Sequence, residues 1–130
     1  MFGFGNNKKK AEKAEKVELT EEEKSSLKQQ ANDLQSKIAS ADDNQKPDLY
    51  DGLGGIFQKL DDVDGAIDAF ESSLKIKERY GAAYNSLLTL YDIKRKCAAE
   101  NKDNDEIQKW INKTDDLLAM SKRVMRSTMV

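Results

Sequence analysis

The feature that most constrains the fold of this chain is a set of residues that recurs after 34 positions. The recurring pairs are Tyr50 and Tyr84, Leu53 and Leu87, Gly54 and Leu88, and Phe57 and Tyr91. Within each set, spacings of three and four residues place the side chains on one face of a helix. A helical unit of this size cannot bury its apolar face alone, so neighbouring units must stack. The recurrence therefore predicts an all-α fold made of antiparallel helical hairpins.

Five helices are expected. They span about 21–41, about 47–60, about 64–79, the segment between Gly81 and a turn at about Glu100–Asp105, and about 105–126. Thr20 and Glu23 form a capping-box pattern at the start of the first helix. Pro47 suits the first turn of the second helix, because its missing N–H is no loss there. The acidic turn Asp61–Asp64 is placed to cap the third helix, and Gly81 is its expected stop.

Composition favours helices and a protein without membrane spans. The chain has one proline in 130 residues and 35% charged residues, a balance typical of small helical proteins. No stretch approaches the roughly 18 apolar residues of a membrane span, and the N-terminus has the wrong order for a signal peptide. The single cysteine, Cys97, fits a reducing compartment, so we expect a cytoplasmic protein. Cys97 and Trp110 are both interpreted as core residues.

The absence of histidine lowers the expectation of catalysis, because histidine is the commonest general base and metal ligand. We expect no enzyme, no cofactor and no metal site. Residues 1–16 carry five lysines against two glutamates and are expected to be a disordered basic tail, with residues 17–130 forming the helical domain. Residues 17–116 hold 22 acidic against 14 basic residues, which does not favour nucleic-acid binding.

Residues 47–80 resemble one motif of the tetratricopeptide repeat (TPR) family, and residues 81–118 resemble a degenerate second motif. Gly54 and Ala66 stand where the pattern has small residues at the crossing of two helices. The sequence departs from the pattern at Glu78, where many members have proline, and near Ile107, where the second unit lacks a small alanine. The resemblance implies an adaptor or scaffold that binds other proteins.

Members of the TPR family usually bind a partner segment in a groove lined by the first helix of each unit. The resemblance carries this role to seven residues here: Asp51, Gly55, Gln58, Asn85, Ser86, Thr89 and Asp92. Asp51 takes a position where chaperone-binding members have lysine. A basic or neutral partner segment is therefore expected rather than an acidic tail.

Other interpretations stay open. The N-terminal segment MFGFGNNKKK could contact a membrane surface or a partner through Phe2, Phe4 and Lys8–Lys10. The chain would then be a membrane-surface or assembly factor that acts through this segment. Two repeats leave end surfaces that could stack, as in a self-associating structural protein. The run Gly52–Gly55 could pack tightly against the leading helix, or it could leave bare backbone for a partner.

Overall fold

The computed structural model describes residues 18–128, which form five α-helices and no strand. The helices are α2 (Glu21–Ser40), α3 (Lys46–Lys59), α4 (Val63–Ile76), α5 (Ala82–Glu100) and α6 (Asn104–Thr128). The predicted all-α class and the number of helices are confirmed for these residues. The expected basic tail, with Phe2, Phe4 and Lys8–Lys10, lies outside the described residues.

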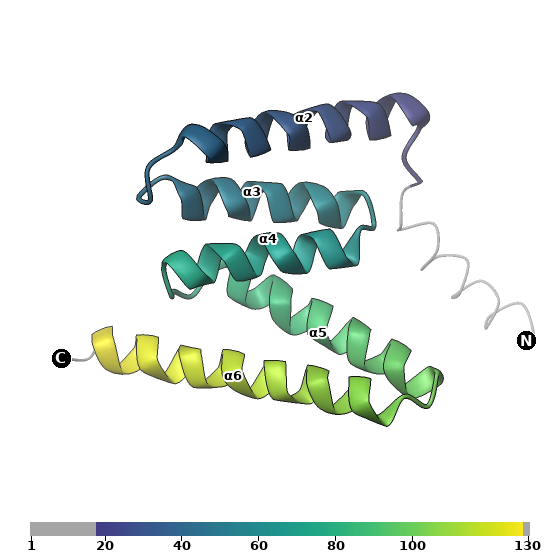
Figure 1. The fold of residues 1–130 in the computed structure, drawn as a ribbon, viewed down its shortest axis with the longest axis vertical. Coiled ribbons are helices and arrows are strands. Elements are labelled where there is room, and N and C mark those ends of the chain that lie inside the picture. The colour runs from purple at the N-terminus through teal and green to yellow at the C-terminus, as the bar shows by residue number, and fades with distance from the viewer. Residues whose placement is uncertain (1–17, 129–130) are drawn as a thin grey trace, which may run out of the picture.

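The five helices form a row in which each packs against the next (Figure 1). α2 and α6 stand at the two ends of this row, and α5 runs obliquely between α4 and α6. α3 also contacts α5, so α3 and α5 approach each other on one side of α4. The row therefore has two end surfaces, one on α2 and one on the α5/α6 pair.

Local hydrogen bonds begin the helices where the sequence predicts. The Thr20 hydroxyl accepts from the Glu23 backbone N–H at 3.1 Å, and the Glu23 carboxylate accepts from the Thr20 N–H at 3.1 Å. Asp62 Oδ1 accepts from the Gly65 N–H at 2.9 Å and caps α4. Each bond satisfies an N–H that has no partner within its helix.

The role expected of Gly81 is wrong. α4 ends at Ile76, and Lys77 is already extended. Gly81 instead precedes α5, with φ of 142°, and its carbonyl accepts from the Asn85 N–H at 3.1 Å. Glycine suits this position because a Cβ would make that φ costly. The residue therefore begins a helix and does not end one.

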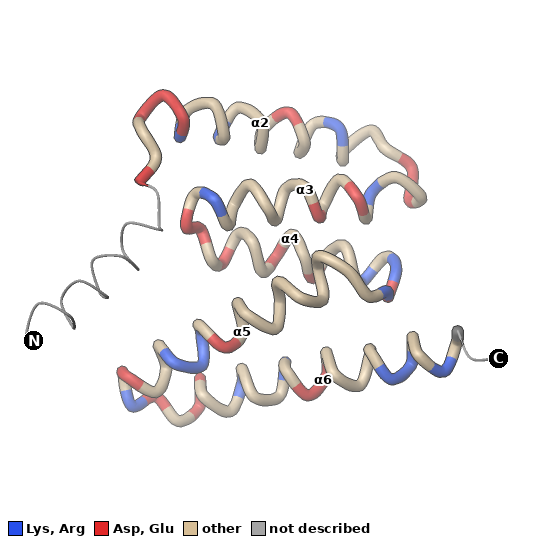
Figure 2. The backbone as a smooth tube through the Cα atoms, turned by 180° about the vertical axis from the view of Figure 1, so that it is seen from behind, with Lys and Arg blue, Asp and Glu red and all other residues tan. Residues whose placement is uncertain are grey.

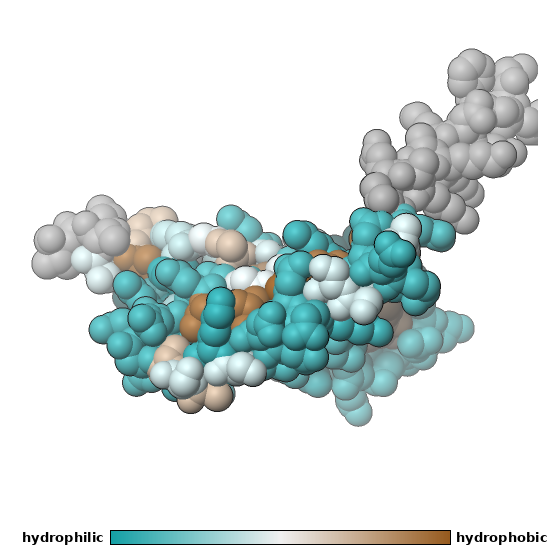
Figure 3. Space-filling view, turned by 90° about the horizontal axis from the view of Figure 1, so that it is seen from above, coloured by the Kyte–Doolittle hydropathy of each residue, from teal (hydrophilic) through white to brown (hydrophobic). Residues whose placement is uncertain are grey.

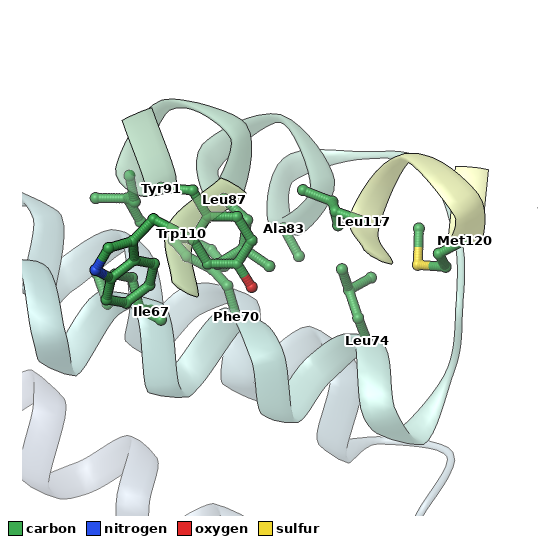
Figure 4. Close-up of a cluster of buried hydrophobic side chains, with 11 residues drawn as sticks. Ile67, Phe70, Leu74, Ala83, Leu87, Tyr91, Trp110, Leu117 and Met120 are labelled. Atoms are coloured by element: carbon green, nitrogen blue, oxygen red, sulfur yellow. The ribbon is translucent and has the colours of Figure 1, made fainter. Parts of the chain in front are cut away.

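The buried side chains of the described residues form two clusters. One joins α2, α3 and α4 around Leu53 and Ile56, and the other joins α4, α5 and α6 around Phe70 and Trp110 (Figure 4). Trp110 is 5% exposed, so its interpretation as a core residue is confirmed. The interpretation of Cys97 is wrong, because Cys97 is exposed while its neighbour Ala98 is buried. One step along a helix turns a side chain by more than a quarter of a turn, which is enough to move it out of the core.

Candidate functional site

The structure places the seven predicted binding residues on two helices. Three lie on α3, namely Asp51, Gly55 and Gln58, and four lie on α5, namely Asn85, Ser86, Thr89 and Asp92. Asn85 and Thr89 are exposed, and the other five are half-buried. Contacts made by individual residues divide this set into two regions, one around Asp51 and one around Thr89 and Asp92.

Asp51 is held by an arginine that the sequence did not single out. Arg79, in the connection between α4 and α5, places Nη2 2.6 Å from Asp51 Oδ2 and 3.6 Å from Asp48 Oδ1. Its Nη1 donates to the Ser73 hydroxyl at 3.1 Å. The side chains of Arg79 and Asp51 are 23% and 21% exposed, so the pair is partly removed from water. The acidic charge expected to attract a basic segment is therefore balanced within the chain.

The glycines of α3 differ in how closely other residues pack against them. A Cβ added at Gly54 would lie 2.7 Å from the Phe70 ring, so only glycine fits where α3 crosses α4. A Cβ at Gly52 would make an ordinary contact with Leu34 of α2 at 3.6 Å. A Cβ at Gly55 would meet no described atom within 4 Å. Gly55 thus leaves an accessible stretch of helix backbone, whereas packing explains Gly54.

Thr89 and Asp92 line a hollow of about 550 Å³ between α5 and α6. Its other lining residues are Leu88, Arg95, Ile111, Thr114 and Asp115. We call these seven residues, together with Leu118 of α6, the α5/α6 end face. Within residues 18–128, the residues that line this hollow come from α5 and α6 alone. The structure therefore unites two of the predicted residues in an open concave surface.

Asp92 is an ion-paired carboxylate on the wall of the hollow. Its carboxylate accepts from Arg95 at 2.7 Å and pairs with Lys96 at 3.0 Å. The hydrogen bonds from Arg95 and Lys96 hold the pKa of Asp92 below its usual value. Asp92 is therefore ionised at neutral pH and can accept further hydrogen bonds from a ligand, since a carboxylate has several lone-pair positions.

Two apolar residues of the end face were not singled out from the sequence. Ile111 and Leu118 lie on α6 beside Trp110 and Leu117. The structure buries Trp110 and Leu117 but leaves Ile111 37% and Leu118 41% exposed. Trp110 and Leu117 are also seven residues apart, so spacing alone does not separate the exposed pair from the buried pair.

A second hollow, of about 500 Å³, lies between α4 and α6. Glu71 of α4 accepts hydrogen bonds from the Tyr91 hydroxyl and from Lys113 Nζ. Burial, reinforced by Glu71, raises the pKa of the Tyr91 hydroxyl above its usual value. These groups already satisfy one another, and they join α6 to α4, so the cluster accounts for part of the fold rather than for a binding site.

The floor of this second hollow is apolar and comes from three helices, as Figure 4 shows for Leu74, Leu87, Leu117 and Met120. Arg123 of α6 crosses it to Glu78, with Nη2 2.6 Å from one carboxylate oxygen and Nε 3.2 Å from the other. This hydrogen bonding by Arg123 lowers the pKa of Glu78. The bridge keeps the C-terminal half of α6 beside the end of α4.

Comparisons with protein-family models, with curated proteins and with solved structures find no match for this chain. None of the helices within residues 18–128 is both long enough and apolar enough to span a lipid bilayer. In the same residues, no three acidic or cysteine side chains gather closely enough to hold a metal ion.

Proposed function

We propose that this chain is a protein-binding helical module of the TPR type, and that the α5/α6 end face is its main binding surface. The single observation that carries the proposal is the open hollow in which exposed Ile111 and half-buried Leu88 stand beside Thr89 and Asp92. Apolar residues at the centre of a concave patch with a polar rim are typical of protein interfaces.

The partner is a segment with both apolar and hydrogen-bonding side chains. Ile111 and Leu118 are each more than a third exposed, and covering apolar surface contributes roughly 25 cal/mol per Å². Asp92 and Thr89 add hydrogen-bonding groups that fix the orientation of the segment. The ion pair between Arg79 and Asp51 removes the reason for requiring a basic partner.

Asn85, Ser86 and the α3 residues Gln58 and Gly55 extend the proposed surface toward the side on which α3 and α5 meet. These residues are polar or lack a side chain, and Asn85 is exposed. They supply complementarity to a bound segment, whereas the apolar residues of the end face supply most of the binding free energy.

Affinity capture with the full chain as bait tests the proposal, with proteins identified by mass spectrometry. Ile111→Gln removes an apolar side chain from the end face. Ile76→Gln is the matched control, because Ile76 on α4 is 39% exposed and Ile111 is 37% exposed. A protein captured by the unchanged chain and by the Ile76 variant, but not by the Ile111 variant, supports the proposed surface. Retention by both variants, with loss on Asn85→Ala and Gln58→Ala together, moves the site to the side of α3 and α5 and overturns this placement.

A further inference from the structure

The exposed side of α6 carries an apolar row with a constant spacing. Ile111 and Leu118 are seven residues apart and are 37% and 41% exposed. Met125 follows after seven more residues and is 51% exposed. Seven residues make about two turns of an α-helix, so the three side chains lie along one face. This face adjoins the hollow described above.

The opposite end of the row of helices is polar. The buried residues of α2 are Leu27, Ala31 and Ile38. All exposed residues of α2 are polar or charged except Ala39. Figure 3 views the protein from the α2 side, and hydrophilic residues make up most of the surface in that view. A second copy stacked head to tail would place the apolar row of α6 on this polar surface, and such stacking would also continue into a filament.

The charges of α6 instead suit a contact between two identical faces. From Asp115 to the C-terminal end of α6, the acidic residues come first and the basic residues follow (Figure 2). Asp115 precedes Leu118 by three residues, and Lys122 follows it by four. Both are exposed, and neither is ion-paired with another residue of the described range.

A two-fold axis at Leu118 would bring these charges together. Two α6 helices related by this axis run antiparallel, so residues at equal distances before and after Leu118 come opposite each other. Asp115 of one copy then lies within about one residue, or about 1.5 Å along the axis, of Lys122 of the other copy. The symmetry makes this pair twice, and it also brings Ile111 beside Met125. A parallel arrangement would not unite the opposite charges.

We propose that the occupant of the α5/α6 end face is a second copy of this chain, joined through an antiparallel α6–α6 contact centred on Leu118. This inference rests on the proposed function, because it names the partner of the same surface. A contact based on one helix pair falls near the lower end of specific interface sizes. We therefore expect a dimer that dissociates on dilution, with Kd on the order of micromolar.

Sedimentation equilibrium of the full chain over a range of concentrations tests the dimer. The unchanged chain should show a concentration-dependent mass reaching twice that of one chain, and Leu118→Lys should remain monomeric with an unchanged far-UV circular dichroism spectrum. Asp115→Lys replaces two attractions with two repulsions and should weaken the dimer about tenfold or more. Adding Lys122→Asp to this variant should restore the affinity, whereas Asp68→Lys, the same charge change on α4, should leave it unaltered.

Several outcomes would overturn the inference. A monomer at all concentrations does so, and the proposed function then stands only if Ile111→Gln still loses a captured protein. If no capture depends on Ile111 either, both proposals fall. A dimer that survives Leu118→Lys and Asp115→Lys rejects the α6 contact. A dimer that is lost only when residues 2–10 are deleted rejects it as well and assigns self-association to the N-terminal segment.

Discussion

Replacing Gly54 or Gly55 by alanine should change the stability of this protein in opposite directions. The two glycines are adjacent on α3, and each substitution adds one methyl group without charge. A Cβ at Gly54 would lie 2.7 Å from ring atoms of Phe70, whereas a Cβ at Gly55 would meet nothing within 4 Å. The pair therefore isolates the effect of packing from that of the amino-acid change.

The magnitudes follow from two opposing contributions. Alanine is favoured over glycine in a helix interior by about 1 kcal/mol, and this gain applies at both positions. At Gly54 the added methyl group must displace Phe70, which is 1% exposed and surrounded by the core. Overpacking of this kind costs typically about 1–3 kcal/mol. We expect Gly54→Ala to lower the free energy of unfolding by up to about 2 kcal/mol and Gly55→Ala to raise it by up to about 1 kcal/mol.

Urea unfolding followed by far-UV circular dichroism measures this difference. With the slopes usual for small proteins, the two midpoints should differ by about 1 M. If Gly54→Ala proves as stable as Gly55→Ala, the close crossing of α3 and α4 at Phe70 is refuted. Gly55→Ala has a second use, because loss of a captured protein without loss of stability would show that a partner approaches the α3 backbone.

Two further changes test the ion pairs and hydrogen bonds. Burial and Glu71 raise the pKa of Tyr91, so the stability that this residue contributes is present below about pH 10 and is lost as the pH rises further. In urea titrations, the free energy of unfolding of the unchanged chain should fall by up to about 1.4 kcal/mol per pH unit above about pH 10. The same alkaline slope in Tyr91→Phe would contradict this cause. Arg79→Leu leaves the half-buried Asp51 without its cation. Asp51 Oδ1 already has no hydrogen-bond partner among the described residues. The free energy of unfolding should therefore fall by about 1–3 kcal/mol. Adding Asp51→Asn should recover part of that loss, and simple additivity of the two changes would show that the pair is not coupled.

The starts of two helices could be read from the sequence because the interactions that form them are local. Thr20 and Glu23 exchange hydrogen bonds across three residues. The Asp62 carboxylate accepts from the Gly65 N–H at the start of α4 across the same sequence distance. Neighbours in sequence are neighbours in space at a helix start, whatever the rest of the fold does. The expected Gly81 stop failed because the chain leaves α4 early, at Ile76, and no local pattern marks that point.

The sequence pointed to only some residues of the α5/α6 end face, because the contacts that form this face are not local. Thr89 and Asp92 do line an open hollow, but the exposed pair Ile111 and Leu118 was not singled out, and Arg79 was not foreseen beside Asp51. Arg79 reaches Asp51 across 28 residues of sequence, so its position depends on how α4 returns to α5.

The sequence by itself determined that residues 18–128 form five amphipathic helices, since apolar spacing and capping residues act within a few positions of one another. Only the tertiary structure decided which side of each helix meets a neighbour. It buried Ala98 and exposed Cys97, and it turned Ile111 and Leu118 outward beside buried Trp110 and Leu117. An amphipathic pattern indicates that a helix has an apolar side, but the width of the contact and the rotation of the helix come from the packing of its neighbours.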